Sequence, residues 1–197
     1  FRWCIGFFYY HYGDWRMSTL RVDNLQSRTG NTVTMPAGYK FYAPGHMVQI
    51  VQTVKTDVFS TTSQAWVDIT GLSVTITPTS ASSKILIFVD LALGPTSGSG
   101  ASARLLRNST AIYVGDAAGS RPQALGEADG GAQYSTNKMG GIYLDSPATT
   151  SAVVYKLQTM NTTGTNTTYV GQTGADRNTS YYDPRTPNSI TVMEIAQ

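Results

Sequence analysis

The chain has 197 residues, of which 13% are charged and 11% aromatic, and a formal net charge of +2. That length suffices for one sizeable hydrophobic core, and few charges with abundant Thr, Ser, Gly and Tyr are typical of an all-β protein. The basic side chains are scattered singly, without the run that would neutralise phosphates, which argues against nucleic-acid binding. The single cysteine, Cys4, excludes an internal disulfide framework, so stability must come from packing or from association with other chains.

The first sixteen residues differ in composition from the rest of the chain. Half of them are aromatic, but two glycines, a histidine and an aspartate interrupt the run, which is too short to span a bilayer. The run also lacks the smooth apolar stretch and the cleavage site of a signal peptide. Residues 1–16 are therefore either an unusual leader ahead of Met17 or a docking peptide whose aromatic rings bury in a partner.

Residues 17–45 are predicted to form an extended N-terminal arm. Apolar residues are few here, and Gly or Pro breaks the chain repeatedly, so the segment cannot build its own core. Its order is expected to depend on a surrounding partner. The apolar side chains expected to attach the arm are Leu20, Val22, Leu25 and Val33.

The central strands of the predicted domain lie within residues 74–93. Residues 85–93 are apolar at both alternating sets of positions, which predicts a strand buried on both sides, with Ile87 on one face and Phe88 on the other. A polar loop, residues 78–83, joins this strand to the β-branched run at 74–77.

The segments before this pair are also predicted to be strands. Residues 46–56 alternate as a strand with one buried face. Residues 59–69 form a second run, in which Trp66 is expected to lie in the core, and a turn follows at Thr70 and Gly71.

The segments after Gly94 continue the β pattern. Two short strands, 103–107 and 110–114, suit a hairpin, and a long Gly- and Ala-rich loop covers 116–139. Further strands are predicted at 142–144, 152–160, 167–172 and 190–195. About eight to ten strands with no helical period predict an antiparallel β-sandwich or jelly roll, residues 46–197, behind the arm.

The residues that could carry chemistry give no catalytic site. With only His11, His46 and Cys4 available, neither a zinc site nor a Cys-His pair can be assembled. Glycoside cleavage needs two carboxylates across a cleft. The acidic residues considered for this role are Glu127, Asp129, Asp145 and Asp183, and no pair among them is distinguished from its neighbours. The sequence predicts a protein without enzymatic activity, cofactor or metal.

Binding is the better hypothesis, and the long loops are its expected place. Tyrosine rings stack on sugar rings, and the guanidinium fork of arginine donates hydrogen bonds to hydroxyl groups. An alternative is that some of the tyrosines in the long loops pack between subunits. The candidate receptor-binding residues are Tyr134, Tyr181, Tyr182, Arg121, Arg177 and Arg185.

Six stretches of the chain carry a family resemblance: MSTLRVDNLQSRTGNTVTMPAG, APGHMVQIVQT, VDITGLSVTITPTSASSKILIFV, RLLRNSTAIY, YLDSPATTSAVVYKLQ and SITVMEIAQ. Residues 17–197 resemble bacteriophage virion proteins that are called tail fibre or virion structural proteins. The resemblance implies a C-terminal jelly roll similar to tumour-necrosis-factor-like trimers, an N-terminal arm that joins the virion, and no catalysis. The leader and the absence of a long shaft depart from this pattern.

Three functions remain open. The first is a tail-fibre-like virion protein whose trimeric head binds a glycan or protein on the host surface. The second is a capsid or tail decoration (cement) protein without a receptor, and the third is a glycan depolymerase. Other virion proteins and two further copies of the chain are the expected partners, because an isolated sandwich would leave apolar side chains such as Val48, Ile50, Val153 and Tyr155 uncovered.

Overall fold

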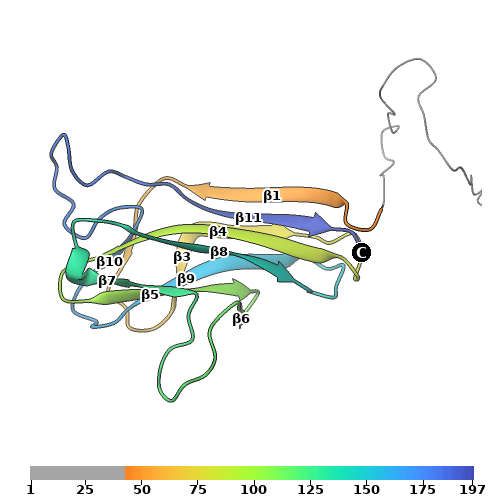
Figure 1. Ribbon diagram of the computed structural model, residues 1–197, viewed down its shortest axis with the longest axis horizontal. Helices are drawn as coiled ribbons and strands as arrows, with labels where there is room; N and C mark the ends of the chain where they lie inside the picture. Colours follow the sequence, from red (N-terminus) through yellow and green to blue (C-terminus); the bar gives the residue numbers. More distant parts are fainter. Residues whose placement is uncertain (1–42) are drawn as a thin grey trace, which may run out of the picture. The chain divides into compact units, whose positions relative to one another are not determined.

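The computed structural model describes residues 43–197. The leader and all but the end of the predicted arm, with Leu20, Val22, Leu25 and Val33, lie outside the described residues. The described part is an antiparallel β-sandwich of two sheets (Figure 1). Four long strands of sheet A lie side by side in the order β1 (Met47–Lys55), β11 (Asn188–Ile195), β4 (Lys84–Pro95) and β8 (Asn137–Asp145). Two short strands extend the sheet at the end of β4: β10 (Thr168–Val170) pairs with β4, and β2 (Phe59–Thr61) pairs with β10. Sheet B contains β3 (Val67–Ile76), β9 (Val153–Asn161) and β5 (Gly100–Arg107), whose other edge pairs with β6 (Thr110–Ile112) and β7 (Gly126–Asp129). A single 3-10 turn, η1 (Gly130–Ala132), follows β7.

Apart from the β5–β6 hairpin, strands that are hydrogen-bonded neighbours are not consecutive along the chain. In sheet A, β11 pairs with both β1 and β4, and β4 pairs with β8; in sheet B, β9 lies between β3 and β5. Within the described residues, the chain crosses from one sheet to the other six times: between β2 and β3, β3 and β4, β4 and β5, β7 and β8, β8 and β9, and β9 and β10. This is the connectivity of a jelly roll, which confirms the predicted fold class.

The core lies between the sheets and follows from the alternation of side chains along each strand. Alternate residues of β4 from Ile85 to Leu93 are at most 8% exposed. They meet the inward residues of the other strands: Leu72, Val74, Ile76, Leu105, Val153, Tyr155, Leu157, Ile190 and Val192. The prediction that Val153 and Tyr155 would be uncovered in an isolated sandwich is wrong, because both side chains point into this core.

The prediction that β4 is buried on both sides is only half right. Leu86 and Phe88 lie on the outer face of sheet A and are half-buried. No second layer of described residues covers that face, so these side chains are shielded only by their neighbours within the sheet.

Two local predictions on sheet B are wrong. The predicted turn at Thr70 and Gly71 is a β-bulge within β3, where the pairing with β9 shifts register and Gly71 adopts φ +81°. Trp66 is not a core residue: its ring lies on the outer side of sheet B, 4.4 Å from the guanidinium carbon of Arg104. The predicted hairpin at 108–109 is confirmed by the pairing of β5 with β6.

Most loops gather at two opposite ends of the sandwich, and the loop between β6 and β7 protrudes from its side (Figure 1). At one end, here called the entry end, the chain enters through residues 43–46 and β11 finishes, and Gly45 N–H donates to the carbonyl of Ala196 at 2.8 Å. At the other end, called the loop end, lie residues 96–99, 130–136, 162–167 and 171–187. Among the described residues, no helix is long and apolar enough to cross a membrane.

Candidate functional site

Residues 171–187 join β10 to β11 at the loop end, and their first part is seated closely on the sandwich. Gly171 N–H donates to the carbonyl of Ala92 at 3.0 Å, and Ala175 N–H donates to the carbonyl of Gln133 at 2.9 Å. A Cβ atom on Gly94 would lie 2.2 Å from the backbone oxygen of Gln172. The glycine in β4 therefore permits a direct backbone contact that fixes the base of the 171–187 loop.

The side chain of Asp183 organises the rest of this loop. Its carboxylate accepts hydrogen bonds from Arg177 Nε at 2.8 Å, from Arg177 Nη2 at 3.3 Å and from the Arg177 backbone N–H at 2.7 Å. The hydrogen bond from the Arg177 side chain is the main reason that the pKa of Asp183 is lowered to about 2. The Asp183 side chain is fully buried, so this charge-assisted pair closes the loop upon itself.

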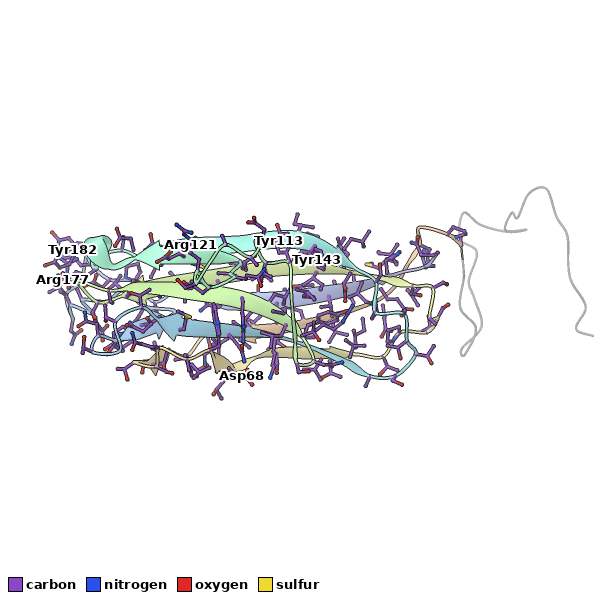
Figure 2. All side chains as sticks on the ribbon, turned by 90° about the horizontal axis from the view of Figure 1, so that it is seen from below. Asp68, Tyr113, Arg121, Tyr143, Arg177 and Tyr182 are labelled. Carbon is purple, nitrogen blue, oxygen red and sulfur yellow. The ribbon has the colours of Figure 1, made fainter. Side chains whose placement is uncertain are left out.

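Arg177 also holds two tyrosine rings. Its guanidinium carbon lies 4.4 Å from the ring centroid of Tyr134, in the loop after η1, and 4.4 Å from that of Tyr182. Both are cation–π contacts. Tyr134 and Tyr182 are each 58% exposed. Figure 2 shows Arg177 and Tyr182 together at the extreme loop end. We call these three residues the Tyr134–Arg177–Tyr182 cluster.

A pocket of about 400 Å³ opens beside the cluster. All of its lining residues are polar: Asp176, Arg177, Asn178, Thr179, Tyr182, Asp183 and Arg185. Arg185 Nη2 lies 2.9 Å from Asp176 Oδ1, and both side chains are about half exposed. Each arginine of the pocket is thus paired with an aspartate of the same loop.

The structure brings together most of the six residues predicted to bind a receptor. Tyr134, Arg177 and Tyr182 are in contact, Arg185 lines the same pocket, and Tyr181, next to Tyr182 in the chain, is 92% exposed.

Arg121 does not join them. It lies in the segment between β6 and β7, along the side of the sandwich (Figure 2), and its Nη1 donates to the carbonyl of Ala118 at 3.4 Å. Arg121 and Tyr134 are close in sequence, but β7 and η1 lie between them and carry the chain away. Asp176, Asn178 and Thr179 were missed; the only signal for them was the polar character of the loop.

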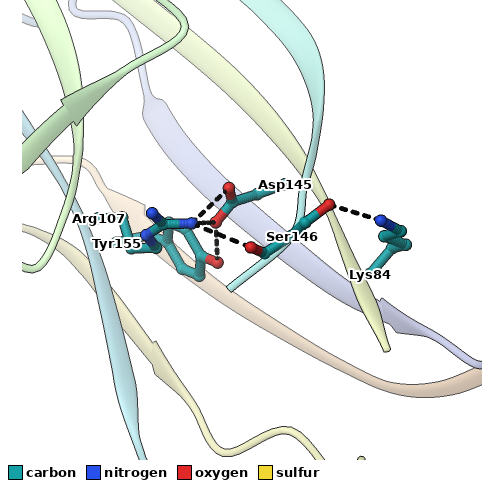
Figure 3. Close-up of polar contacts among 5 residues, drawn as sticks. All are labelled: Lys84, Arg107, Asp145, Ser146 and Tyr155. Atoms are coloured by element: carbon teal, nitrogen blue, oxygen red, sulfur yellow. Dashed lines mark hydrogen bonds and ion pairs between the residues drawn. The ribbon is translucent and has the colours of Figure 1, made fainter. Parts of the chain in front are cut away.

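The carboxylates considered for catalysis lie in separate surroundings. Asp145 is buried near the entry end, where it accepts hydrogen bonds from Arg107 Nη1 at 2.8 and 3.1 Å and from the Tyr155 hydroxyl at 2.7 Å (Figure 3). Asp183 is at the loop end, and its lowered pKa is opposite to the raised value that a general acid needs. Asp129 accepts from the Gly131 N–H at 3.0 Å and caps η1. Glu127 lies in β7.

A second surface of functional interest is the outer face of sheet A. One row across four strands is entirely apolar: Ile50 in β1 is opposite Met193 in β11, Met193 is opposite Leu86 in β4, and Leu86 is opposite Leu144 in β8. In the next row, Phe88 is opposite Ile142. Large side chains remain exposed across this face: Ile50 is 52%, Leu144 52% and Ile142 61% exposed. We call it the apolar A face.

The outer face of sheet B has the opposite character. Lys156 Nζ and Gln158 Nε2 each donate to Asp68 at 2.7 Å, and Arg104 Nε donates to Gln158 Oε1 at 2.8 Å. The pKa of Asp68 is lowered, chiefly by the hydrogen bond from Lys156. This face is a polar network, typical of a surface in contact with water.

Within residues 43–197, no group of three or more His, Cys, Asp or Glu side chains is placed to hold a metal ion.

Comparison with known proteins gives structural similarity alone. No protein-family model matches the chain, and no curated protein matches it. Among solved structures, the chain is similar to that of infectious bursal disease virus Gt strain, with 11% identity over 84% of this chain and 42% of that chain, at a TM-score of 0.42. The crystal structure of the infectious bursal disease virus VP2 subviral particle gives the same values. The structure of the Gx strain matches at 15% identity over 84% of this chain and 45% of that chain, at a TM-score of 0.40. The chain spans less than half the length of each of these proteins.

Proposed function

We propose that this protein is a non-enzymatic structural protein of a bacteriophage virion, similar to a tail fibre. In this proposal the sandwich forms a homotrimer through the apolar A face, and the N-terminal arm attaches the trimer to the particle. The observation that carries the proposal is the apolar A face itself, because a soluble monomer rarely exposes a continuous apolar surface of this kind.

The contrast between the two outer faces supports association through sheet A. Both faces follow the same alternation of side chains, yet they differ in chemistry. The outer face of sheet B carries Asp68, Ser73, Thr75, Lys156 and Gln158, whereas two rows of sheet A carry Ile50, Met193, Leu86, Leu144, Phe88 and Ile142. Toward the loop end the outer face of sheet A becomes polar, with Lys138 paired to Asp90. Burying the apolar side chains of the two rows contributes roughly 25 cal/mol per Å² of apolar surface removed from water. Association through the apolar A face is thus favoured, and the sheet B face stays in solvent.

Three copies around an axis need two different surfaces on each chain, because a cyclic trimer is built from head-to-tail contacts. A second surface adjoins the apolar A face at the β8 edge. There Tyr113 stacks on Tyr143 with the ring centroids 5.1 Å apart, and Tyr113 is 40% exposed. In the proposed trimer, this edge of one copy packs on the apolar A face of the next.

The two ends of the sandwich support the division between attachment and host binding. The arm joins the sandwich at the entry end, and the candidate receptor-binding residues lie at the loop end. In this proposal the particle holds the arm, and the loop end remains free to bind the host.

The apolar A face is also compatible with a second function, that of a decoration protein whose sheet packs on other virion proteins. Electron microscopy of particles carrying a labelled chain separates the two: label at the tip of a tail appendage supports the fibre, and label spread over the capsid supports decoration.

The trimer is tested by multi-angle light scattering of the full chain at micromolar concentration. The expected mass is three times that of the chain. Ile142→Lys places a charge in the apolar A face and should yield monomers, because burying an unpaired ammonium group costs several kcal/mol. Thr75→Lys, at an exposed position on the outer face of sheet B, is the matched control and should remain trimeric. A wild-type monomer, or an Ile142→Lys trimer, would contradict the proposal.

The attachment role is tested by deleting residues 1–42. The deletion keeps the hydrogen bond between Gly45 and Ala196, so the remaining chain should be a folded, trimeric head that no longer enters particles. Normal incorporation of the truncated chain would show that the arm is not the anchor.

A further inference from the structure

We infer that the loop end carries a binding site for neutral glycans, formed by the Tyr134–Arg177–Tyr182 cluster and the adjoining pocket. The inference deepens the host-attachment role proposed above and rests on it. It assigns the ligand class and gives Arg177 a different part from the one expected from the sequence.

Arg177 is a support for the aromatic rings and not the main donor to a ligand. Two of its guanidinium nitrogens are engaged by Asp183, and its guanidinium carbon contacts both tyrosine rings. Tyr134 and Tyr182 are consequently held in place although more than half of each residue is exposed. A ring that is fixed before binding loses little conformational entropy when a ligand stacks on it.

The pocket provides hydrogen-bonding groups beside these rings. Asn178 offers an amide and Thr179 a hydroxyl, while Asp176 and Arg185 are about half exposed. The pocket thus combines hydrogen-bond donors and acceptors with the ring of Tyr182. A pyranose ring matches this arrangement, because it has an apolar face for stacking and hydroxyl groups around its rim.

The charges of the pocket select for a neutral ligand. Arg177 is paired with Asp183 and Arg185 with Asp176, so the positive and negative groups that line the pocket are equal in number. An anionic glycan needs an excess of positive charge to offset the loss of its hydration. A neutral hexose has no such requirement.

The test is biolayer interferometry of the full chain at physiological salt against two groups of immobilised polysaccharides. The neutral group is mannan, dextran and galactan; the acidic group is hyaluronan and polygalacturonate. We expect binding to at least one neutral polysaccharide and none to the acidic ones. Tyr182→Ala should weaken each site roughly two- to tenfold, the range for one aromatic contact. Tyr182→Phe, which keeps the ring, should retain most of the binding.

Two controls accompany the binding measurement: a variant away from the loop end, and the oligomeric state of each sample. Thr75→Ala changes an exposed residue on the outer face of sheet B, away from both the loop end and the apolar A face, and should leave glycan binding unchanged. Light scattering on the same samples separates the two proposals: a trimer that binds no neutral polysaccharide overturns the glycan site alone, and a monomer that binds overturns the trimer alone. Binding to acidic polysaccharides only, or binding insensitive to Tyr182→Ala, also overturns the glycan site.

Discussion

The carboxylate of Glu194, at the end of β11, accepts hydrogen bonds from both the backbone N–H and the hydroxyl of Thr79, each at 2.7 Å. Gln49 of β1 donates to its other oxygen at 2.6 Å. Glu194 is fully buried, and burial alone would raise its pKa, but the hydrogen bonds from Thr79 and Gln49 outweigh burial and lower the pKa. One side chain thus joins β1, β11 and the loop between β3 and β4 at the entry end.

Replacing Glu194 with Ala should lower the free energy of unfolding by roughly 2 to 4 kcal/mol, because Thr79 and Gln49 lose their acceptor and a cavity remains at a fully buried position. Glu194→Gln should cost less, since one oxygen still accepts. Since the folded-state pKa is lowered, the wild-type stabilisation is complete above the unfolded value of about 4.3 and declines as the pH falls below it. Urea titrations from pH 7 to pH 3 measure both effects. The exposed Glu127→Gln is the control; equal losses at the two positions would contradict this role of Glu194.

Two adjacent residues of β4 should respond differently to truncation. Ile87 is fully buried between the sheets, so Ile87→Ala should lower the free energy of unfolding by roughly 2 to 5 kcal/mol at any protein concentration. Phe88 lies on the apolar A face, so Phe88→Ala should chiefly weaken association and shift the thermal midpoint only where trimers form. Calorimetry over a hundredfold range of concentration separates the two. A concentration-independent loss at Phe88 as large as that at Ile87 would place Phe88 in the core.

The pairing of Asp183 with Arg177 should make the loop end sensitive to acid. The folded pKa of Asp183 is about 2 and the unfolded value about 3.9, so the stabilisation is complete above about pH 4 and is lost as the pH falls toward about 2. The amide and Nε–H resonances of Arg177, followed by NMR, should shift in that window. In Asp183→Asn the transition should be absent. If the midpoint of this transition in the wild-type protein were near pH 4, the pairing of Asp183 with Arg177 would not stabilise the loop.

Gly94 should be needed for the seating of the 171–187 loop. An alanine there would place Cβ against the Gln172 carbonyl, and neither backbone can move freely, so the loop should lift from β4 while the core stays intact. We expect faster amide hydrogen exchange at residues 171–176 in Gly94→Ala and little change elsewhere. Gly115→Ala, where a Cβ would meet nothing within 4 Å, is the control. If amide hydrogen exchange at residues 171–176 were unchanged in Gly94→Ala, Gly94 would not be needed to seat the loop.

Alternation along single strands predicted the fold class, since it depends only on neighbours in sequence. The period-two pattern of residues 85–93 identified β4, and the pattern of residues 190–195 identified most of β11. The pattern could not show what Glu194 binds, because Thr79 is 115 positions away. The pattern also could not show whether Phe88 is covered by a second layer of the protein or lies on an outer apolar surface, because an apolar residue fits both positions.

The candidate site shows the same limit. Tyrosines and arginines in polar loops indicated a binding end, and Tyr134, Arg177 and Tyr182 do meet there. Arg121 was grouped with them because it is close to Tyr134 in sequence. Strand β7 lies between these two residues and separates them in space. The role of Arg177 as a support depends on Asp183, whose left-handed backbone conformation at φ 57° no residue pattern indicates.

The position of β11 has a consequence for biosynthesis. This strand is the last along the chain, yet it lies between β1 and β4 and supplies the pairing that holds β1 in sheet A. A ribosome that adds roughly 5 to 20 residues per second needs on the order of ten seconds to travel from β1 to β11. During that interval β1 and one edge of β4 have no partner strand, and the apolar side chains of β4 are open to other nascent chains. We therefore expect chaperone binding to be concentrated on ribosome-bound chains that lack residues 188–195, and to end when this strand emerges.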